Sequence, residues 1–160
     1  MEFHDLLPMN KSRKRPKEGD VFLVQPFLGV HYYGKVIQTQ ISSKDSCVNG
    51  MNLIFLYRRR AQKRTIPEDL SEAEFLILPV IINQLPWSRG YFETIGSAGV
   101  TEAEMDRSYG FWSFQKKRFV DVSGSLLTEK PECWSDYGLA SYAVVGEKIQ
   151  TVLKEKRGPL

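Results

Sequence analysis

The sequence has few of the residues from which metal and disulfide sites are built. Its 160 residues include two cysteines, Cys47 and Cys133, and two histidines, His4 and His31. No CxxC pair occurs, and so few cysteines and histidines argue against a structural zinc site. A chain of this size forms its core without a covalent staple, so both cysteines are expected to be reduced thiols. We expect no metal and no other cofactor.

Long hydrophobic runs are also missing. The longest apolar stretch, residues 75–82 around Pro79, is far shorter than the roughly 18–20 residues that a membrane-spanning helix needs. The first residues carry charges where a signal peptide would have its apolar segment. These features predict a cytoplasmic protein that has no membrane partner.

The common catalytic patterns are absent as well. There is no phosphate-binding loop, and residues 96–99 form a lone glycine pair outside the setting of a dinucleotide site. A nucleophilic triad would depend on His4 or His31, and a strand histidine is more often held structurally. The acids Glu102 and Glu104 fit the first turn of a helix, where they complement its dipole. We therefore expect a protein that is not an enzyme.

Basic residues are clustered although the net charge is only +3, from 22 Lys plus Arg against 19 Asp plus Glu. The clusters lie at residues 11–17 and 58–64, and each would either attract phosphates or form a solvated surface. No aromatic motif of an RNA-binding module accompanies them, so nucleic acid is not the expected partner. Residues 1–16 are polar and aperiodic. They predict a basic N-terminal arm, either disordered or lying on a single domain at 17–160.

Alternating and β-branched residues between turn formers predict a series of strands. They are expected at 19–25, 30–41, 51–58, 75–83 and 90–96, with a final hairpin at 111–114 and 118–122. The first three follow one another through short connections, which favours an antiparallel meander. Gly34 indicates a bulge or a close backbone approach, and Pro79 indicates an edge or a bulge.

Short helical segments interrupt and end this pattern. Residues 66–74 predict one helical turn with a capping box from Ser71 to Glu74, and residues 102–109 predict a brief helix with a box from Thr101 to Glu104. A C-terminal helix is expected at 141–155, packed by a stripe of Val145, Ile149, Val152 and Leu153. The fold class is therefore α+β. We predict a strongly bent antiparallel sheet or small partly open β-barrel with short inserted helices and a C-terminal helix.

Four segments carry a family resemblance. They read KEGDVFLV at 17–24, YYGKVI at 32–37, NLIFLY at 52–57 and GYFETIG at 90–96. In this order they resemble the immunity protein 26 family of bacterial polymorphic toxin systems, over roughly residues 17–122. The resemblance implies a small cytosolic protein that binds and neutralises a cognate toxin domain without catalysis. The slightly basic charge disfavours mimicry of nucleic acid.

Such a protein needs surface anchors, and aromatic and arginine side chains supply most interface hot spots. Trp87, Tyr91, Trp112 and Trp134 fall in or beside expected loops and strand ends, although most of them are expected to serve packing. From these and the second basic run we predict a set of partner-binding residues. They are Arg58, Arg59, Arg60, Trp87 and Tyr91.

Two other functions stay open. The GDVFLV opening is also similar to that of small barrel endoribonuclease toxins, in which Arg58, Arg59 or Arg60 could supply the charge for RNA cleavage. The Arg-Pro strand typical of those toxins is absent, since residues 33–37 read YGKVI. A nucleic-acid-binding module that uses the basic runs is the third hypothesis, and it predicts steeply salt-dependent binding.

Overall fold

The computed structural model describes residues 5–156, and its first strands form the expected antiparallel meander. These strands are β1 (Asp20–Phe27), β2 (Val30–Gln38), β3 (Asn52–Ala61) and β4 (Phe75–Ile82). Pro79 lies where the pairing of β3 with β4 shifts register, between Ile77 and Val80. The proline therefore lies at an irregularity, as its missing N–H requires.

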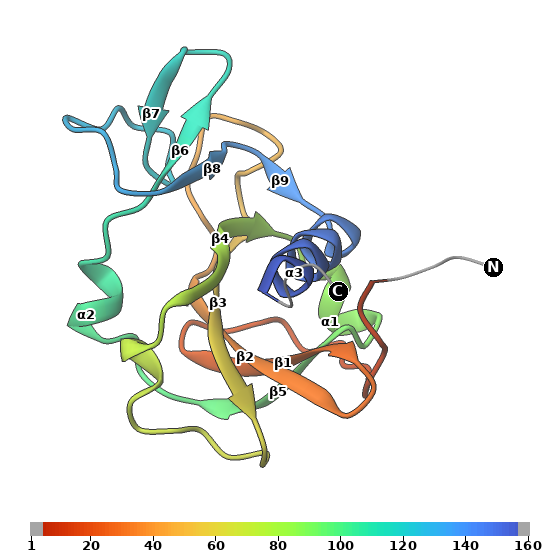
Figure 1. The fold of residues 1–160 in the computed structure, drawn as a ribbon. Helices are drawn as coiled ribbons and strands as arrows, with labels where there is room; N and C mark the ends of the chain where they lie inside the picture. Colours follow the sequence, from red (N-terminus) through yellow and green to blue (C-terminus); the bar gives the residue numbers. More distant parts are fainter. Residues whose placement is uncertain (1–4, 157–160) are drawn as a thin grey trace.

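Strands distant in sequence complete the sheet at both edges. β5 (Phe92–Ser97) pairs antiparallel with β1, and β9 (Leu139–Ala140) pairs parallel with β4. The order is β5–β1–β2–β3–β4–β9, and within residues 5–156 the edge strands do not pair with each other. The sheet is thus open, and its curvature is visible in Figure 1. The predicted α+β class is confirmed.

A smaller sheet lies beyond β4, in the order β7–β6–β8. The hairpin of β6 (Gly110–Ser113) and β7 (Arg118–Val120) occurs where it was predicted, and β8 (Trp134–Asp136) pairs parallel with β6. The prediction that this hairpin is the last strand pair was wrong. β8 and β9 are too short to show a periodic pattern in the sequence.

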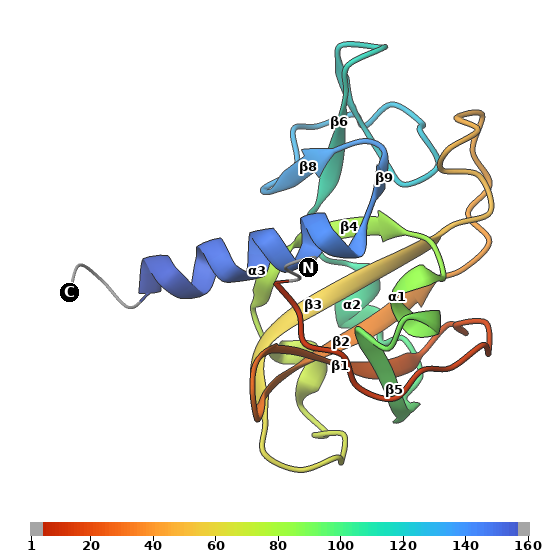
Figure 2. The same ribbon diagram turned by 90° about the vertical axis from the view of Figure 1, so that its right-hand side faces the viewer.

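The C-terminal helix α3 (Tyr142–Lys156) is present as predicted, and Figure 2 shows it running along β4 and continuing beyond the sheet. α2 (Glu102–Met105) begins with the predicted capping box but ends well before residue 109. The turn η1 (Leu70–Glu72) has Asp69 at its N-cap with no side-chain cap, so the expected box from Ser71 was wrong. α1 (Leu85–Ser88) was not predicted. No helix in the described part of the chain is long and apolar enough to cross a membrane.

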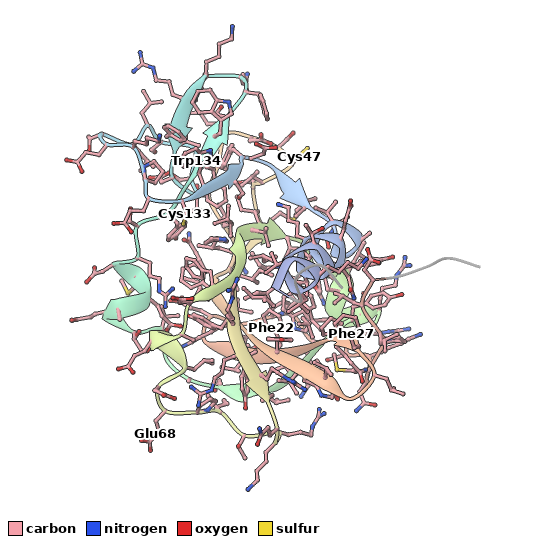
Figure 3. The ribbon with its side chains drawn as sticks, in the orientation of Figure 1. Phe22, Phe27, Cys47, Glu68, Cys133 and Trp134 are labelled. Atoms are coloured by element: carbon pink, nitrogen blue, oxygen red, sulfur yellow. The ribbon has the colours of Figure 1, made fainter. Side chains whose placement is uncertain are left out.

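Both faces of the large sheet are buried, which explains the nearly continuous burial along its central strands. On one face Phe22 and Ile54 pack in one cluster with Val145 and Ile149 of α3. Figure 3 labels Phe22 within this layer. The opposite face packs against the small sheet and η1 through a second cluster, and Glu104 of α2 bonds to Tyr57 on the same face. Its members include Leu23, Phe55, Tyr57, Leu70, Phe111 and Val120.

Gly34 lies where β2 passes directly under two large side chains. A Cβ at this position would lie 2.4 Å from the ring of Phe22 and 2.8 Å from Cδ2 of Leu56. Only glycine fits without moving them, so the predicted close approach is confirmed.

The segment before β1 lies against the domain. Leu6 is 2% exposed and belongs to the same cluster as Phe22. The backbone N–H of Leu7 donates to the carbonyl of Gln25 at 2.7 Å, and that of Met9 donates to the carbonyl of Gly90 at 2.7 Å. Residues 5–16 of the predicted arm therefore pack on the domain, while residues 1–4 lie outside the described chain.

Candidate functional site

The three consecutive arginines of β3 have different environments. Arg58 is half-buried between β4 and α3, where it lines a groove with Leu78 and Val144. Arg59 pairs with Asp69 at 3.2 Å, and both side chains are about half exposed. Arg60 is exposed. An arginine pair on the solvent side of the strand end is thus available to a partner, whereas Arg58 is largely covered.

The two predicted aromatic anchors lie in the core. Trp87 is 1% exposed, and its Nε1 donates to Oγ1 of Thr94 at 3.1 Å. Its ring meets the ring of Phe92 edge-on at 5.1 Å. Tyr91 is 8% exposed and stacks on Tyr142 at 4.7 Å. Neither ring presents a face to a partner, so the five predicted residues do not share one surface.

Arg59 and Arg60 line a shallow hollow of about 360 Å³ at the end of β3. Lys63 and Tyr33 also line it. The Tyr33 hydroxyl donates to the carbonyl of Thr65 at 2.5 Å, which fixes the loop that follows β3. Burial raises the pKa of Tyr33 against the opposing effect of Arg59, so the phenol stays neutral. The hollow is therefore positively charged, and the neutral Tyr33 adds no negative charge to it.

Two segments far apart in the sequence meet at the carboxylate of Glu93: the loop after β3 and the residue just before the N-terminal basic run. Asn10 donates its side-chain N–H to Oε1 at 2.6 Å, and the Arg64 guanidinium lies 2.5 Å from Oε2. Glu93 is 8% exposed, so both oxygens are engaged within the protein. Lys11 lines a hollow with Glu93 just beyond Asn10. The fold thereby brings Arg64 of the second basic run close to Asn10, next to the first run.

A buried ionic network ties α2 to the sheet. Lys35 of β2 and Glu104 of α2 are 3% and 0% exposed, and their charged atoms lie 2.7 Å apart. Nζ of Lys35 also donates to the carbonyl of Gly99 at 2.9 Å. The second oxygen of Glu104 accepts a hydrogen bond from the Tyr57 hydroxyl, and Oε1 accepts the Thr101 N–H at 3.0 Å.

The pKa shifts of this network follow from its contacts. Burial acts to raise the pKa of Glu104, but hydrogen bonds from Lys35, Tyr57 and Thr101 outweigh it, so the pKa is lowered overall. Burial and the bond to Glu104 strongly raise the pKa of Tyr57. The acid and the amine neutralise each other away from solvent. This arrangement stabilises the fold and offers no acid or base to a substrate.

The remaining ionisable groups give little support for a catalytic or metal-binding role. Burial and nearby Arg64 lower the pKa of His31 against the effect of Glu93, so the imidazole is neutral at pH 7. Cys47 and Cys133 are free thiols and lie apart (Figure 3). Burial and Glu132 raise the pKa of the Cys133 thiol, which lowers the fraction of reactive thiolate at pH 7. In residues 5–156, no group of three or more His, Cys, Asp or Glu side chains could hold a metal.

An aromatic row lies on the outer face of the small sheet. The ring of Phe119 meets Trp112 at 5.0 Å and Trp134 at 4.9 Å, and Nζ of Lys130 lies 4.9 Å from the centre of the Trp134 ring. Phe114 is 68% exposed at the end of β6. The sequence predicted that Trp112 and Trp134 lie in or beside loops and strand ends. The predicted hairpin brings Phe119 beside Trp112, whereas the contact of Phe119 with Trp134 depends on the long-range pairing of β6 with β8, which was not predicted.

Comparison with known proteins adds one result to this α+β fold. A model of the immunity protein 26 family matches residues 17–118, which is well over half of the chain. The chain therefore belongs to the immunity protein 26 family, as the four sequence segments indicated. No curated protein and no solved structure matches it.

Proposed function

We propose that this chain is a non-catalytic immunity protein that acts in the bacterial cytoplasm. It binds a cognate toxin domain of a polymorphic toxin system and neutralises it by covering a surface that the toxin needs. The observation that carries this proposal is the family match over residues 17–118. Membership implies a toxin partner, and such a role requires a complementary surface rather than a reaction centre.

The environments of the polar residues support a binding role. The buried acid Glu104 is neutralised by Lys35, and His31 is a partly buried, neutral strand residue. Lys11, Arg60 and Lys63 of the two basic runs are exposed, so their charges are open to a partner. These features favour recognition over general acid–base catalysis.

Arg59 and Arg60 are the predicted partner-binding residues that the fold leaves accessible. Arginine is enriched at interface hot spots because its planar guanidinium binds carboxylates through two hydrogen bonds. We include both residues in the proposed interface. Trp87 and Tyr91 are buried, and we assign them the role of supporting the surface from beneath.

The proposal is tested by co-expressing the chain with the toxin domain encoded beside its gene. We expect growth rescue together with formation of a complex by the purified proteins. The double substitution Arg59→Ala and Arg60→Ala should weaken binding by about tenfold or more, since truncating a hot-spot residue costs at least about 2 kcal/mol. Lys44→Ala, at an exposed residue of another loop, is the matched control.

Two results would overturn the proposal. The first is a chain that neither binds this toxin domain nor rescues growth. The second is cleavage of RNA by the purified chain, which would favour the endoribonuclease alternative.

A further inference from the structure

The N-terminal basic run is held on the domain as a fixed strap. We define the basic strap as residues 10–17, which include five exposed cations: Lys11, Arg13, Lys14, Arg15 and Lys17. Its backbone is bound along its length. The Ser12 N–H donates to the carbonyl of Trp87 at 3.0 Å, and the Gln84 side chain donates to the carbonyl of Arg13 at 3.0 Å. The Lys17 N–H donates to Asp20 at 2.9 Å.

The surface beneath is shaped to receive this segment. Gly90 has a φ of +84°, and a Cβ there would lie 2.7 Å from the Met9 carbonyl oxygen, just before the strap. Trp87, buried below, provides the carbonyl that holds Ser12. Figure 2 shows the N-terminal segment passing beside α1 and β5. The bonds to the strap use its backbone, so its charged side chains are free to contact another molecule.

No described residue neutralises the positive charge of the basic strap by contact. Within residues 5–156, none of its cations forms an ion pair. The acids near the strap do not pair with its cations. Glu93 binds Asn10 and Arg64, and Asp20 accepts a backbone N–H. Glu18 is exposed to solvent. Like charges gathered on one segment repel each other and stabilise nothing locally. Their placement is therefore understood best as recognition of a negatively charged partner.

The basic strap forms a ridge between two hollows. A hollow of about 780 Å³ on one side is lined by Lys11, Lys14 and Lys17, by Asp20, and by residues of β5 that include Glu93. A hollow of about 570 Å³ on the other side is lined by Arg13 and by Leu85, which is 42% exposed. No acidic residue lines this second hollow within the described chain. Charge on a ridge flanked by partly apolar hollows gives a partner both electrostatic and shape contacts.

We propose that the basic strap is a docking element for an acidic face of the cognate toxin domain. This inference rests on the proposed function and specifies the chemistry of the partner's surface. All of the strap except Lys17 precedes the matched residues 17–118, so it adds a contact mostly outside the part that matches the family. Because its backbone is already ordered, binding requires little further loss of conformational freedom.

The same observations favour a protein over a nucleic acid as the partner. Proteins that bind single strands stack bases on exposed aromatic rings beside their cations. The only aromatic side chain that lines either hollow, within the described residues, is Trp87, and it is 1% exposed. Surfaces that bind nucleic acid are themselves positive and would repel the strap. A toxin that acts on nucleic acid would therefore be held at an acidic face outside its substrate groove.

The decisive experiment measures association kinetics with the toxin domain encoded beside the gene, over a range of salt concentrations. In the full chain, Arg13→Glu, Lys14→Glu and Arg15→Glu are combined, since none of these side chains holds the strap in place. We expect the association rate at low salt to fall by about tenfold or more and its salt dependence to flatten. A second variant with glutamine at the same three positions should show a smaller fall in the same direction.

The matched control reverses three exposed cations elsewhere, by Lys44→Glu, Arg118→Glu and Lys154→Glu, and should change the rate much less. Equal losses in both triple variants would overturn the strap's role, as would unchanged kinetics in the strap variants. Binding of duplex DNA or RNA that the strap variants lose, with toxin binding intact, would assign the strap to nucleic acid instead. If the wild-type chain does not bind the toxin domain at all, the proposed function fails, and the role of the strap fails with it.

Discussion

The carboxylate of Glu104 is fully buried, and the hydrogen bonds that keep it charged come from three segments of the chain. Lys35 lies on β2, Tyr57 lies on β3, and Thr101 precedes α2. In the sequence, Glu104 has the spacing of a capping box, and that role is confirmed. Its pairing with Lys35 was not predicted, because the two residues are 69 positions apart and share no local pattern.

Replacing Glu104 by glutamine should destabilise the protein strongly. The substitution keeps the shape of the side chain but leaves Lys35 charged and buried without an anion. We expect a loss of about 3 kcal/mol in the free energy of unfolding, measured by urea denaturation. The control is Glu102→Gln on the same helix, where the side chain is exposed and the loss should stay below about 1 kcal/mol. Equal stability of both variants would contradict the structural role of the network.

The same carboxylate should make stability depend on acidity. The pKa of Glu104 is lower in the folded chain than its ordinary value of 4.5. A group of this kind stabilises the fold above its unfolded pKa, and the contribution is lost as the pH falls toward the folded pKa. The gap in unfolding free energy between wild type and Glu104→Gln should therefore be widest above about pH 4.5 and narrow below it. A gap that widens on acidification would contradict this assignment.

At the scale of the elements, β1 and β2 approach each other through Gly34. Gly34→Ala would place a methyl group against Phe22 and Leu56, which are 0% and 1% exposed in the core. We expect a loss of about 1–3 kcal/mol, the usual cost of overpacking a core. Gly138→Ala provides the control, because a Cβ there meets nothing within 4 Å. Thermal unfolding that shifts equally in both variants would argue against the close approach.

The segment that carries the basic strap is anchored by Leu6. This side chain is 2% exposed among core residues that include Val145 of α3, so Leu6→Ala should cost about 2–3 kcal/mol. It should also speed hydrogen exchange at the amides of Met9 and Ser12, whose bonds hold the following residues. Leu28→Ala, at a side chain that is 87% exposed, should change neither quantity. Unchanged exchange in Leu6→Ala would show that the strap is held independently of this anchor.

Across the whole molecule, local patterns predicted the elements and missed the long-range pairs. Alternation along β1 to β4 and the stripe on α3 are strong signals, because they repeat over many residues. The burial of Trp87 and the parallel pairing of β9 with β4 depend on which segments meet in space. For this reason the sequence predicted the accessible residues Arg59 and Arg60 but not the burial of Trp87 and Tyr91. Arginine is exposed by default, whereas a tryptophan beside a turn can be either anchor or core.

The sheets take in strands from well past the part that matches the family, so we expect the folding unit to extend beyond residue 118. After residue 118 the chain supplies β8 and β9 to the two sheets, and α3 buries Val145 and Ile149 against the large one. Without them, apolar side chains on one face of β4 would be exposed to water. A chain cut after residue 118 should therefore lose cooperative thermal unfolding and bind a hydrophobic dye, whereas the full chain unfolds in one transition. In the full chain, Val145→Asp should reproduce the defect, and Val144→Asp, at a side chain that is 40% exposed, should not. A truncated chain that unfolds cooperatively would show that the matched part folds by itself.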